Sequence, residues 1–456
     1  MADSSLTALR SFYNTGETRS IQFRRKQLMM LKEFVISNED KIAAALYKDL
    51  HKSREEAYAS ETGIFLMELN HTLANFGKWS SPVAAKTSFL NFPSSSKIYR
   101  EPLGVVLIIG PWNYPFQLIM IPLMAAIAAG NCVVVKPSEV AVATAALIEK
   151  MLTELFPENF VRTLQGAGED VIPPAINSFR FDHIFYTGSS LVGKEIYKMA
   201  ASQLIPVTLE LGGKSPAVVE ADADIQVSAR RIVLGKWLNA GQTCIAPDYL
   251  LVHESRKEEL VSAIKETLST FYTADARDSY DYGRIIHEKR MRKLVSFLDQ
   301  GKLLYGGDYD MSELYFGPTL MDGILPHSAI MQEEIFGPIL PVLTYRDTAE
   351  AMEIVSHNPD PLAFYLFTQD KKIINEWINN TSFGGGCINN TAYHFANYHL
   401  PFGGVRASGM GAYHGRYTFD VFSRPKAVMK TPLWFDPRIK YPSFKGKINL
   451  LKRMFR

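Results

Sequence analysis

The feature that most constrains this fold is a regular alternation of short apolar runs with helical stretches, which begins after Gly104. Each run, such as VVLIIG, CVVVKPS, DHIFYTG or PVTLEL, has the length of a strand, and stretches with helical spacing separate the runs. Strands that alternate with helices in this way form a parallel sheet covered on both faces. Ligands bind to such sheets at the carboxyl ends of the strands.

A second alternation runs from Ser215 to Asn390, through AVVE, YLLVHE, ILPVLTY, AFYLF and GGCINN. The sequence therefore predicts an α/β protein with two doubly wound, Rossmann-like domains. A helical stretch at residues 19–79 precedes them, and TSFLNFPSSSKIYR alternates around a Pro/Ser turn, which indicates a hairpin in a small β arm for oligomerisation. The expected boundaries are 1–80 and 103–208 for the dinucleotide-binding domain, 209–395 for the catalytic domain, 81–102 and 396–430 for the arm, and 431–456 for a basic tail.

The composition excludes several classes of protein. With 456 residues, of which 47% are apolar and 21% charged, the chain can bury sizeable cores and is not disordered as a whole. A net charge of +2 gives no field that would draw the whole molecule to nucleic acid. The three cysteines lie far apart, which suits a reducing, cytoplasmic setting and argues against a disulfide framework. The N-terminus lacks the apolar core of a secretory signal.

Cys244 is the candidate nucleophile. It lies in KWLNAGQTCIAPDYLLV, between a helical stretch that ends near Asn239 and a strand that starts near Tyr249. A thiol on a loop at a helix end can be partly exposed and favoured as the thiolate, which is what a nucleophile requires. The alternative is burial as a small apolar side chain, which Cys132 in NCVVV fits well.

Glu210 and Asn113 also follow apolar strands. Glu210 ends the mostly apolar strand in PVTLEL, shortly before a diglycine. A carboxylate there is costly to bury unless it is solvated or takes part in a reaction, so Glu210 is a candidate general base. Asn113 lies in the proline-flanked loop of IIGPWNYPFQ, where a fixed amide can donate to a developing oxyanion. The alternatives are an ion-paired or capping glutamate and a turn asparagine that satisfies its own backbone.

Two further segments are candidates for a dinucleotide site. In DHIFYTGSSLVGKEI, a strand is followed by Gly188, Ser189 and Gly193 and then by a helix, whose start can cradle a diphosphate. This turn does not match GxGxxG, so it is a weak fingerprint when taken alone. Lys136 and Glu139 follow the strand of VVVKPSE and are of the right chemical type for ribose hydroxyls.

Other side chains near these motifs have competing interpretations. Tyr114 and Trp237 are neighbours of the candidate catalytic residues in sequence and could line an apolar funnel, or could be ordinary core. The histidines of NYHLPFGGVRASGMGAYHG lack the spacing of metal ligands, so no metal site is expected.

Taken in order, PWNYP, KPSE, YTGS, ELGGK, GQTC, EEIFGP and PFGG resemble the aldehyde dehydrogenase superfamily across almost the whole chain. The details of NYHLPFGGVRASGMGAYHG and GQTCIAPDY are similar to its class 3 branch, which includes dimeric and fatty-aldehyde dehydrogenases. The resemblance implies that Cys244 attacks an aldehyde, while Asn113 and the Cys244 amide stabilise the oxyanion. Hydride transfer would leave a thioester, which water activated by Glu210 would hydrolyse to the acid.

The resemblance also implies a cofactor and an assembly. Lys136 and Glu139 would bind the adenosine ribose, Gly188 and Ser189 would lie near the pyrophosphate, and Glu334 and Phe336 would bind the nicotinamide ribose. Glu139 would repel a 2′-phosphate, so NAD is the expected cofactor, although the branch is similar to enzymes that also accept NADP. A homodimer is expected, with a medium-chain, long-chain or aromatic aldehyde as the substrate.

The C-terminal stretch RIKYPSFKGKINLLKRMFR has no acidic residue, and Ile448, Leu451 and Phe455 recur at helical spacing. Such a basic amphipathic helix could lie on an anionic membrane surface or cover the substrate entrance. Two rival functions stay open: a dehydrogenase of the same fold that passes the acyl group to coenzyme A, and a non-catalytic, membrane-associated protein that has kept the fold. Enzymes of the first kind generally lack the glutamate of ELGGK, which is present here as Glu210.

Overall fold

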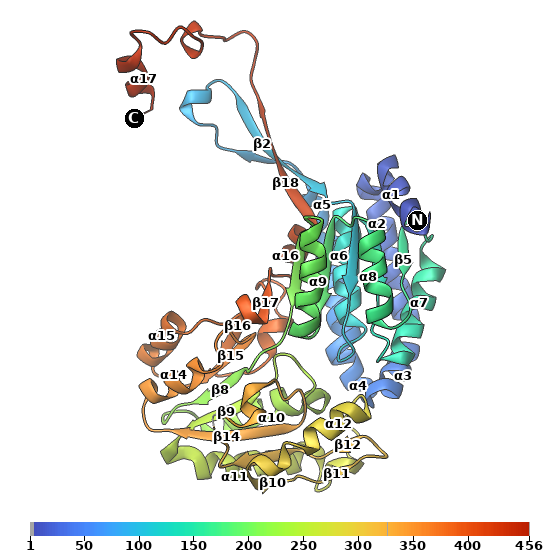
Figure 1. Cartoon of the computed structure of the whole chain (residues 1–456), viewed down its shortest axis with the longest axis vertical. Helices are drawn as coiled ribbons and strands as arrows, with labels where there is room; N and C mark the ends of the chain where they lie inside the picture. Colours follow the sequence, from blue (N-terminus) through green and yellow to red (C-terminus); the bar gives the residue numbers. More distant parts are fainter. Residues whose placement is uncertain (1–3, 326, 456) are drawn as a thin grey trace.

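The computed structural model describes residues 4–325 and 327–455. Two α/β lobes lie against each other, and a narrow arm projects from one of them (Figure 1). The chain opens with helices only, as the sequence predicts. These helices are α1 (Ser4–Thr15), α2 (Ile21–Ser37), α3 (Glu39–Leu50), α4 (Arg54–Ala57) and α5 (Gly63–Ser80), with a π-helical turn at Tyr58–Thr62.

The first lobe contains a six-stranded sheet in the order β17-β7-β6-β3-β4-β5. Its parallel strands are β3 (Val105–Ile109), β4 (Cys132–Lys136), β5 (Val161–Thr163), β6 (His183–Thr187) and β7 (Val207–Glu210). Every residue of β3, β4 and β6 is buried, as expected for strands with helices on both faces. The connecting helices are α6 (Gln117–Ala129), α7 (Val142–Leu155), α8 (Gly168–Ser178) and α9 (Ser190–Ser202).

The second lobe contains a seven-stranded sheet in the order β10-β13-β14-β9-β8-β15-β16. Five of its strands are the runs noted in the sequence: β8 (Pro216–Val219), β9 (Tyr249–His253), β14 (Ile339–Tyr345), β15 (Ala363–Phe367) and β16 (Gly385–Ile388). They pair in parallel, and β13 (Thr319–Asp322) and the antiparallel β10 (Lys302–Tyr305) extend one edge. The main helices of this lobe are α10 (Ile225–Trp237), α11 (Lys257–Tyr272), α12 (Glu288–Val295), α14 (Thr348–Ser356) and α15 (Lys371–Asn380).

The arm is a three-stranded antiparallel sheet that stands away from both lobes (Figure 1). A hairpin forms part of it, with β1 (Val83–Ala85) paired to β2 (Ser95–Pro102), and β18 (Ser423–Lys430) runs along the whole of β2. The first strand lies before the segment TSFLNFPSSSKIYR, in which the sequence predicts the hairpin, and Phe89–Asn91 form a 3-10 turn within that segment. The chain then reaches the far end of the arm, where the short helix α17 (Ile448–Met454) lies far from both large sheets (Figure 1).

Two of the expected domain boundaries need correction. The boundary at 208/209 falls inside β7, so Glu210 belongs to the first sheet. Only β18 joins the arm from residues 396–430, because β17 (Gly409–Met410) pairs with β7 at the edge of the six-stranded sheet. Glycine at 409 permits this pairing, since a Cβ there would collide with the Leu209 carbonyl oxygen.

The mixed α/β class with parallel sheets, predicted from the alternation of strands and helices, is confirmed. Within the described residues, no helix is both long enough and apolar enough to cross a membrane.

Candidate active site

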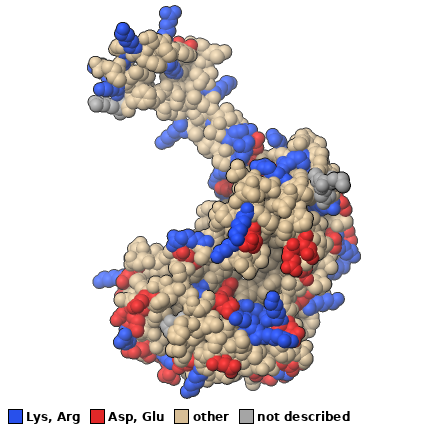
Figure 2. Space-filling view, viewed as in Figure 1, with Lys and Arg blue, Asp and Glu red and all other residues tan. Residues whose placement is uncertain are grey.

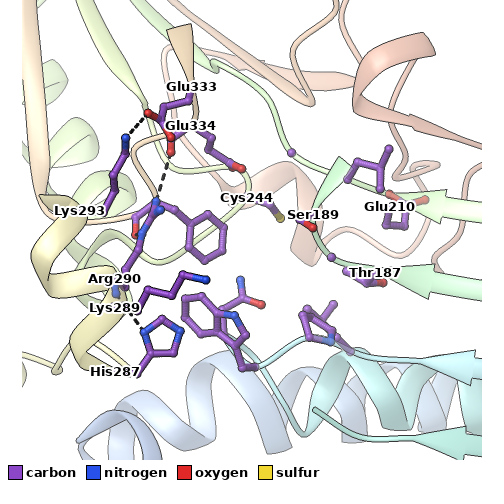
Figure 3. A pocket seen from close by; sticks show the side chains of 18 of the residues that line it. Thr187, Ser189, Glu210, Cys244, His287, Lys289, Arg290, Lys293, Glu333 and Glu334 are labelled. Atoms are coloured by element: carbon purple, nitrogen blue, oxygen red, sulfur yellow. Dashed lines mark hydrogen bonds and ion pairs between the residues drawn. The ribbon is translucent and has the colours of Figure 1, made fainter. Parts of the chain in front are cut away.

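A cavity of about 750 Å³ lies between the two lobes, at the carboxyl ends of the strands of the first sheet (Figure 3). One wall is the turn from β6 to α9, and the opposite wall is α12 with the loop that holds Glu333 and Glu334. Of the residues singled out in the sequence, the structure brings seven to this cavity: Asn113, Gly188, Ser189, Glu210, Cys244, Glu334 and Phe336.

Cys244 lies at the end of a sharply turned loop that follows α10. Asn239 and Ala240 both adopt left-handed conformations, with φ of 54° and 50°, and this turn brings the chain back toward the first lobe. The thiol is half-buried and lines the cavity. Burial, followed by the nearby carboxylates of Glu334 and Glu210, raises the pKa of Cys244 well above its usual value. The expectation of a favoured thiolate therefore needs correction, because burial first, and then the two carboxylates, disfavour the charged form of the thiol.

Asn113 reaches the same place from the loop after β3. Its amide Nδ2 donates to the carbonyl oxygen of Gln242 at 3.1 Å, two residues before the cysteine. Its own carbonyl oxygen accepts from Asn239 Nδ2 at 2.9 Å. The loop that carries the amide and the loop that carries the thiol therefore hold each other in position.

Glu210 is the last residue of β7 and points its carboxylate into the cavity (Figure 3). It is buried, and neither carboxylate oxygen has a hydrogen-bond partner in the part of the chain that the structure describes. Burial alone raises the pKa of Glu210 well above its usual value. A buried acid without a protein partner costs stability, so its position suits reaction better than structure.

The diglycine after Glu210 allows a second carboxylate to approach. A Cβ on Gly212 would collide with the carboxylate of Glu334. Burial, and then the charge of Asp248, raises the pKa of Glu334 to about 8, although Arg290 and Lys214 act in the opposite direction. Beside it, the ring of Phe336 packs edge-on against Trp112 with ring centres 5.2 Å apart.

The glycine turn has the expected local geometry. Ser189 caps α9, because its hydroxyl accepts from the Val192 amide at 3.4 Å. Gly193 is buried in α9, and a Cβ there would come within 2.7 Å of Leu211 Cδ2, so glycine lets the helix pack tightly on the sheet. The hydroxyl of Thr187, just before the turn, is buried without a hydrogen-bond partner among the described residues.

Lys136 and Glu139 lie outside the residues that line this cavity. Lys136 ends the neighbouring strand β4, and its ammonium group is paired with the Glu139 carboxylate. The second oxygen of Glu139 accepts from the Gly168 amide at 3.1 Å. The pair thus occupies the carboxyl end of the same sheet, one strand further toward its β5 edge.

A second, apolar cavity of about 230 Å³ reaches Cys244 and Glu210 from the other side. Tyr114 lines it, and its hydroxyl pairs with Thr243 Oγ1 at 2.6 Å. Most of the remaining wall is aliphatic or aromatic and includes Leu118, Leu234, Leu238, Phe395 and Phe402.

Trp237 lines neither cavity, so its expected role in a substrate funnel needs correction. It is 1% exposed, and its indole N–H donates to the Pro338 carbonyl at 2.9 Å. The side chain faces the core of the second lobe because it lies at the C-terminal end of α10, on the helix's buried side.

The sequence did not predict a fully buried ion pair that lies against the loop of Asn113, next to the loop of Cys244. Lys52 Nζ donates to Glu61 Oε1 at 2.7 Å, and both side chains are 0% exposed. The same ammonium group also donates to the Asn113 carbonyl at 3.2 Å and lies 4.0 Å from the centre of the Tyr114 ring. The other oxygen of Glu61 accepts from the amides of Phe116 and Gln117.

A second buried acid holds the cysteine loop. Glu56 accepts from the Asn239 amide at 2.9 Å, and burial raises the pKa of Glu56 to about 7. Glu61 stands in the π-helical turn, a distortion that is often found at functional sites. In the sequence, Lys52, Glu56 and Glu61 are polar residues in a helical stretch, and this pattern does not predict which loops their side chains contact.

The chain is similar to known proteins over almost its whole length. The sequence model of the aldehyde dehydrogenase family matches residues 3–428. The chain is similar to 4,4'-diaponeurosporen-aldehyde dehydrogenase of Staphylococcus aureus, with 45% identity over 98% of this chain and 97% of that protein. It is 43% identical to aldehyde dehydrogenase family 3 member A2 of Mus musculus, over 95% of this chain and 90% of that protein.

Solved structures agree in fold. The substrate-bound state of Staphylococcus aureus AldH superimposes with a TM-score of 0.97, at 44% identity, over 99% of both chains. Indole-3-acetaldehyde dehydrogenase in complex with NAD⁺ matches with a TM-score of 0.85 at 27% identity, over 94% of this chain and 88% of that one. A glyceraldehyde-3-phosphate dehydrogenase of Methanocaldococcus jannaschii in complex with NADP matches with a TM-score of 0.84 at 26% identity, over 94% of both chains.

The buried ion pair leads to a prediction. Glu61→Gln leaves the Lys52 ammonium buried without its counter-charge, so we expect the free energy of unfolding to fall by about 3–5 kcal/mol. The turnover number should fall as well, because Asn113 loses its support. Urea unfolding and steady-state rates measure the two effects.

The double variant Lys52→Met/Glu61→Gln should recover part of the lost stability, because it removes both charges and keeps an acceptor for the two amides. Glu195→Gln is the matched control, since it breaks an exposed lysine–glutamate pair and should cost less than about 1 kcal/mol. Equal losses in Glu61→Gln and Glu195→Gln would contradict the importance of the buried pair.

Proposed function

Since the chain belongs to the aldehyde dehydrogenase family, whose members oxidise aldehydes with NAD or NADP, we propose that it converts medium-chain, long-chain or aromatic aldehydes to carboxylic acids through a thioester at Cys244. One observation carries the proposal: the thiol and a carboxylate without a protein partner, Glu210, line both the large cavity and the apolar one. A dinucleotide can enter from one side and an aldehyde from the other.

The residues of the large cavity fit a dinucleotide. Its volume lies within the roughly 300–1,000 Å³ of small-molecule and cofactor sites. The start of α9 offers free backbone N–H groups to a pyrophosphate, and the orphaned Thr187 hydroxyl faces the same space. We assign Gly188 and Ser189 to the pyrophosphate, Glu334 and Phe336 to the nicotinamide ribose, and Lys136 and Glu139 to the adenosine ribose. When bound, the oxidised nicotinamide supplies the hydride acceptor.

In the first half of the proposed reaction, Cys244 Sγ passes its proton to a water molecule, which carries it to solvent, and forms a bond to the aldehyde carbon. The carbonyl oxygen becomes an oxyanion, which accepts hydrogen bonds from Asn113 Nδ2 and from the Cys244 amide. In the structure, Asn113 Nδ2 donates to the carbonyl oxygen of Gln242, so this donor is already held beside the cysteine loop. A preorganised donor of this kind is worth about 3 kcal/mol in the transition state. Loss of hydride from the same carbon leaves a thioester on the sulfur.

In the second half, Glu210 takes a proton from a water molecule as the water oxygen bonds to the thioester carbon. The carbon–sulfur bond then breaks, which releases the acid and returns the sulfur of Cys244. A carboxylate with a raised pKa is a stronger base than an ordinary one, so the burial of Glu210 suits this step. This base within reach of the acyl group favours water as the acceptor over coenzyme A.

The apolar cavity supports the choice of substrate. Tyr114, Leu118, Leu234 and Phe402 offer a long, mostly hydrocarbon wall that ends at the thiol. Burying a chain of methylenes against such a wall contributes about 0.8 kcal/mol per CH₂ group. One relative is named for 4,4'-diaponeurosporen-aldehyde, and for this chain we propose an aldehyde with a long apolar or aromatic body.

The arm supports a homodimer. Apart from its first residue, every residue of β18 is exposed, and the apolar Val428 and Met429 are among them. A projecting sheet of this kind buries little surface against its own chain, so we assign a second copy to it.

The tail supports a peripheral contact with an anionic membrane. Leu433 is 98% exposed and Trp434 76% exposed, and the basic helix α17 follows them. Because α17 lies at the far end of the arm, it does not cover the cavity of its own chain (Figure 1).

Glu210→Gln tests the hydrolytic step. We expect one equivalent of reduced dinucleotide per active site to form rapidly, followed by very slow turnover, because the thioester forms but no base activates water. Stopped-flow absorbance and mass spectrometry of the acylated cysteine measure this. Glu195→Gln, on the exposed face of α9, should keep normal turnover, and unchanged steady-state turnover in Glu210→Gln would refute the assignment.

Glu210→Gln should also change how the free energy of unfolding depends on pH. Because the pKa of Glu210 is higher in the folded chain than in the unfolded chain, its favourable contribution is complete at acidic pH and is lost as the pH rises through the folded value. Glu210→Gln should therefore be more stable than the wild type in alkaline buffer, and the difference should vanish in acidic buffer.

Leu234→Trp tests the substrate assignment. A bulkier side chain in the apolar cavity should reduce kcat/KM for decanal by at least tenfold and leave acetaldehyde oxidation within about twofold, since only the longer chain needs the filled space. Leu234→Met keeps the volume and should retain the preference. An equal loss for both aldehydes would exclude this cavity as the site of the chain.

Removal of residues 445–456 tests the tail. Binding to vesicles that contain phosphatidylserine should weaken by more than about tenfold, because each lost basic residue contributes roughly 1 kcal/mol near an anionic surface. Binding to neutral vesicles should be weak with or without the tail. Sedimentation velocity on the same samples should show dimers throughout, and monomers in the intact chain would refute the assembly proposed for the arm.

A further inference from the structure

One lysine side chain that lines the large cavity has no partner among residues 4–325 and 327–455. Lys289 lies in the first turn of α12, and its ammonium end points into the cavity toward the wall that holds Thr187 and Ser189 (Figure 3). The structure gives it no ion pair or hydrogen bond with any described residue. A cluster of basic side chains covers this part of the surface, beside the hollow between the lobes (Figure 2).

The other cations of α12 are all engaged. Lys293 pairs with Glu333 at 2.5 Å, and Arg292 pairs with Glu288 at 2.6 Å. Arg290 donates to the carbonyl oxygen of Glu334 at 3.2 Å and also to that of Ile335. These three side chains shape the wall, and among the described residues Lys289, which is exposed at the rim of the cavity, is the cation of α12 left free for a ligand.

The wall opposite Lys289 is built for an anion. It carries the first turn of α9, a helix of thirteen residues with no acidic residue in that turn. The free N–H groups and the dipole of a helix start favour negative charge. A group held there has backbone donors on one side and faces the ammonium group of Lys289 across the cavity.

We infer that Lys289 binds the pyrophosphate of the dinucleotide from the side opposite α9 and closes the anion site across the two lobes. The inference rests on the proposed function, since it assumes that the large cavity is the dinucleotide site. A lysine on a flexible stem acts as a mobile point charge, so it can reach the phosphate oxygens without fixing their geometry. The turn at Gly188 lacks the usual fingerprint, and a cation from the second lobe supplies contacts that the turn does not.

Binding without turnover tests this role. Affinities of ADP-ribose, which carries the pyrophosphate, and of adenosine, which does not, are measured by calorimetry with the intact enzyme at low and high salt. Lys289→Gln should weaken ADP-ribose binding about three- to tenfold at low salt, as expected for one partly exposed charge-assisted hydrogen bond, and should leave adenosine binding unchanged. High salt should reduce the difference between variant and wild type, because it screens an exposed charge.

Two further variants make the result specific. Lys371→Gln removes an exposed lysine of the same charge from α15, far from the cavity, and should bind ADP-ribose like the wild type. Lys289→Arg keeps the cation and should restore most of the affinity. Equal weakening in Lys371→Gln and Lys289→Gln, or no weakening in Lys289→Gln, would overturn the role of Lys289.

Failure of this inference is distinguishable from failure of the proposed function. If wild-type enzyme oxidises aldehydes and binds ADP-ribose, but Lys289→Gln binds it equally well, only the role of Lys289 is lost. If wild-type enzyme binds no ADP-ribose, or Cys244→Ala still produces reduced dinucleotide from aldehyde, the proposed function itself is lost.

Discussion

The buried pair of Lys52 and Glu61 is the interaction on which the geometry of the site depends. Two charges removed from water cost several kcal/mol each, and the cost is offset only when every donor and acceptor is used. Here the ammonium group is shared among a carboxylate, the Asn113 carbonyl and the Tyr114 ring, and the carboxylate also accepts two backbone amides. Apart from the pair itself, all these partners lie on the loop after β3 or at the start of α6, so this loop cannot shift without breaking several of these contacts at once.

The helical opening of the chain thereby sets the position of residues far away in sequence. Lys52 and Glu61 hold the loop of Asn113, and Glu56 holds the Asn239 amide on the cysteine loop. The amides of Asn113 and Asn239 then tie the two loops together. The proposed oxyanion donor, Asn113, and the proposed nucleophile, Cys244, come from different lobes, yet one small segment, residues 52–61, contacts both of their loops.

The sequence predicted those parts of the site that depend on local order along the chain. Glu210 and Ser189 could be placed because Glu210 ends a strand of a parallel sheet and Ser189 follows another, and the carboxyl ends of such strands meet at one edge. Trp237 could not be placed correctly, because the direction of its side chain depends on the packing of α10 against the second lobe. The raised pKa of the Cys244 thiol could not be predicted either, since it depends first on burial and then on Glu334 and Glu210, which approach the thiol only in the folded chain.

Buried polar groups without a hydrogen-bond partner among the described residues indicate where a ligand binds more directly than the sequence motifs do. Folded chains pair nearly all of their buried polar atoms, so a buried carboxylate with none, such as Glu210, marks a place where another molecule completes the structure. Among the described residues, the buried hydroxyl of Thr187 also lacks a partner at this cavity, and the exposed ammonium group of Lys289 at its rim has none either. These groups fit the proposed ligands, since the acid lies beside the thiol that would carry the acyl group, and the hydroxyl and the cation lie on opposite walls of the proposed pyrophosphate site. Their arrangement around one space explains why the site needs both lobes.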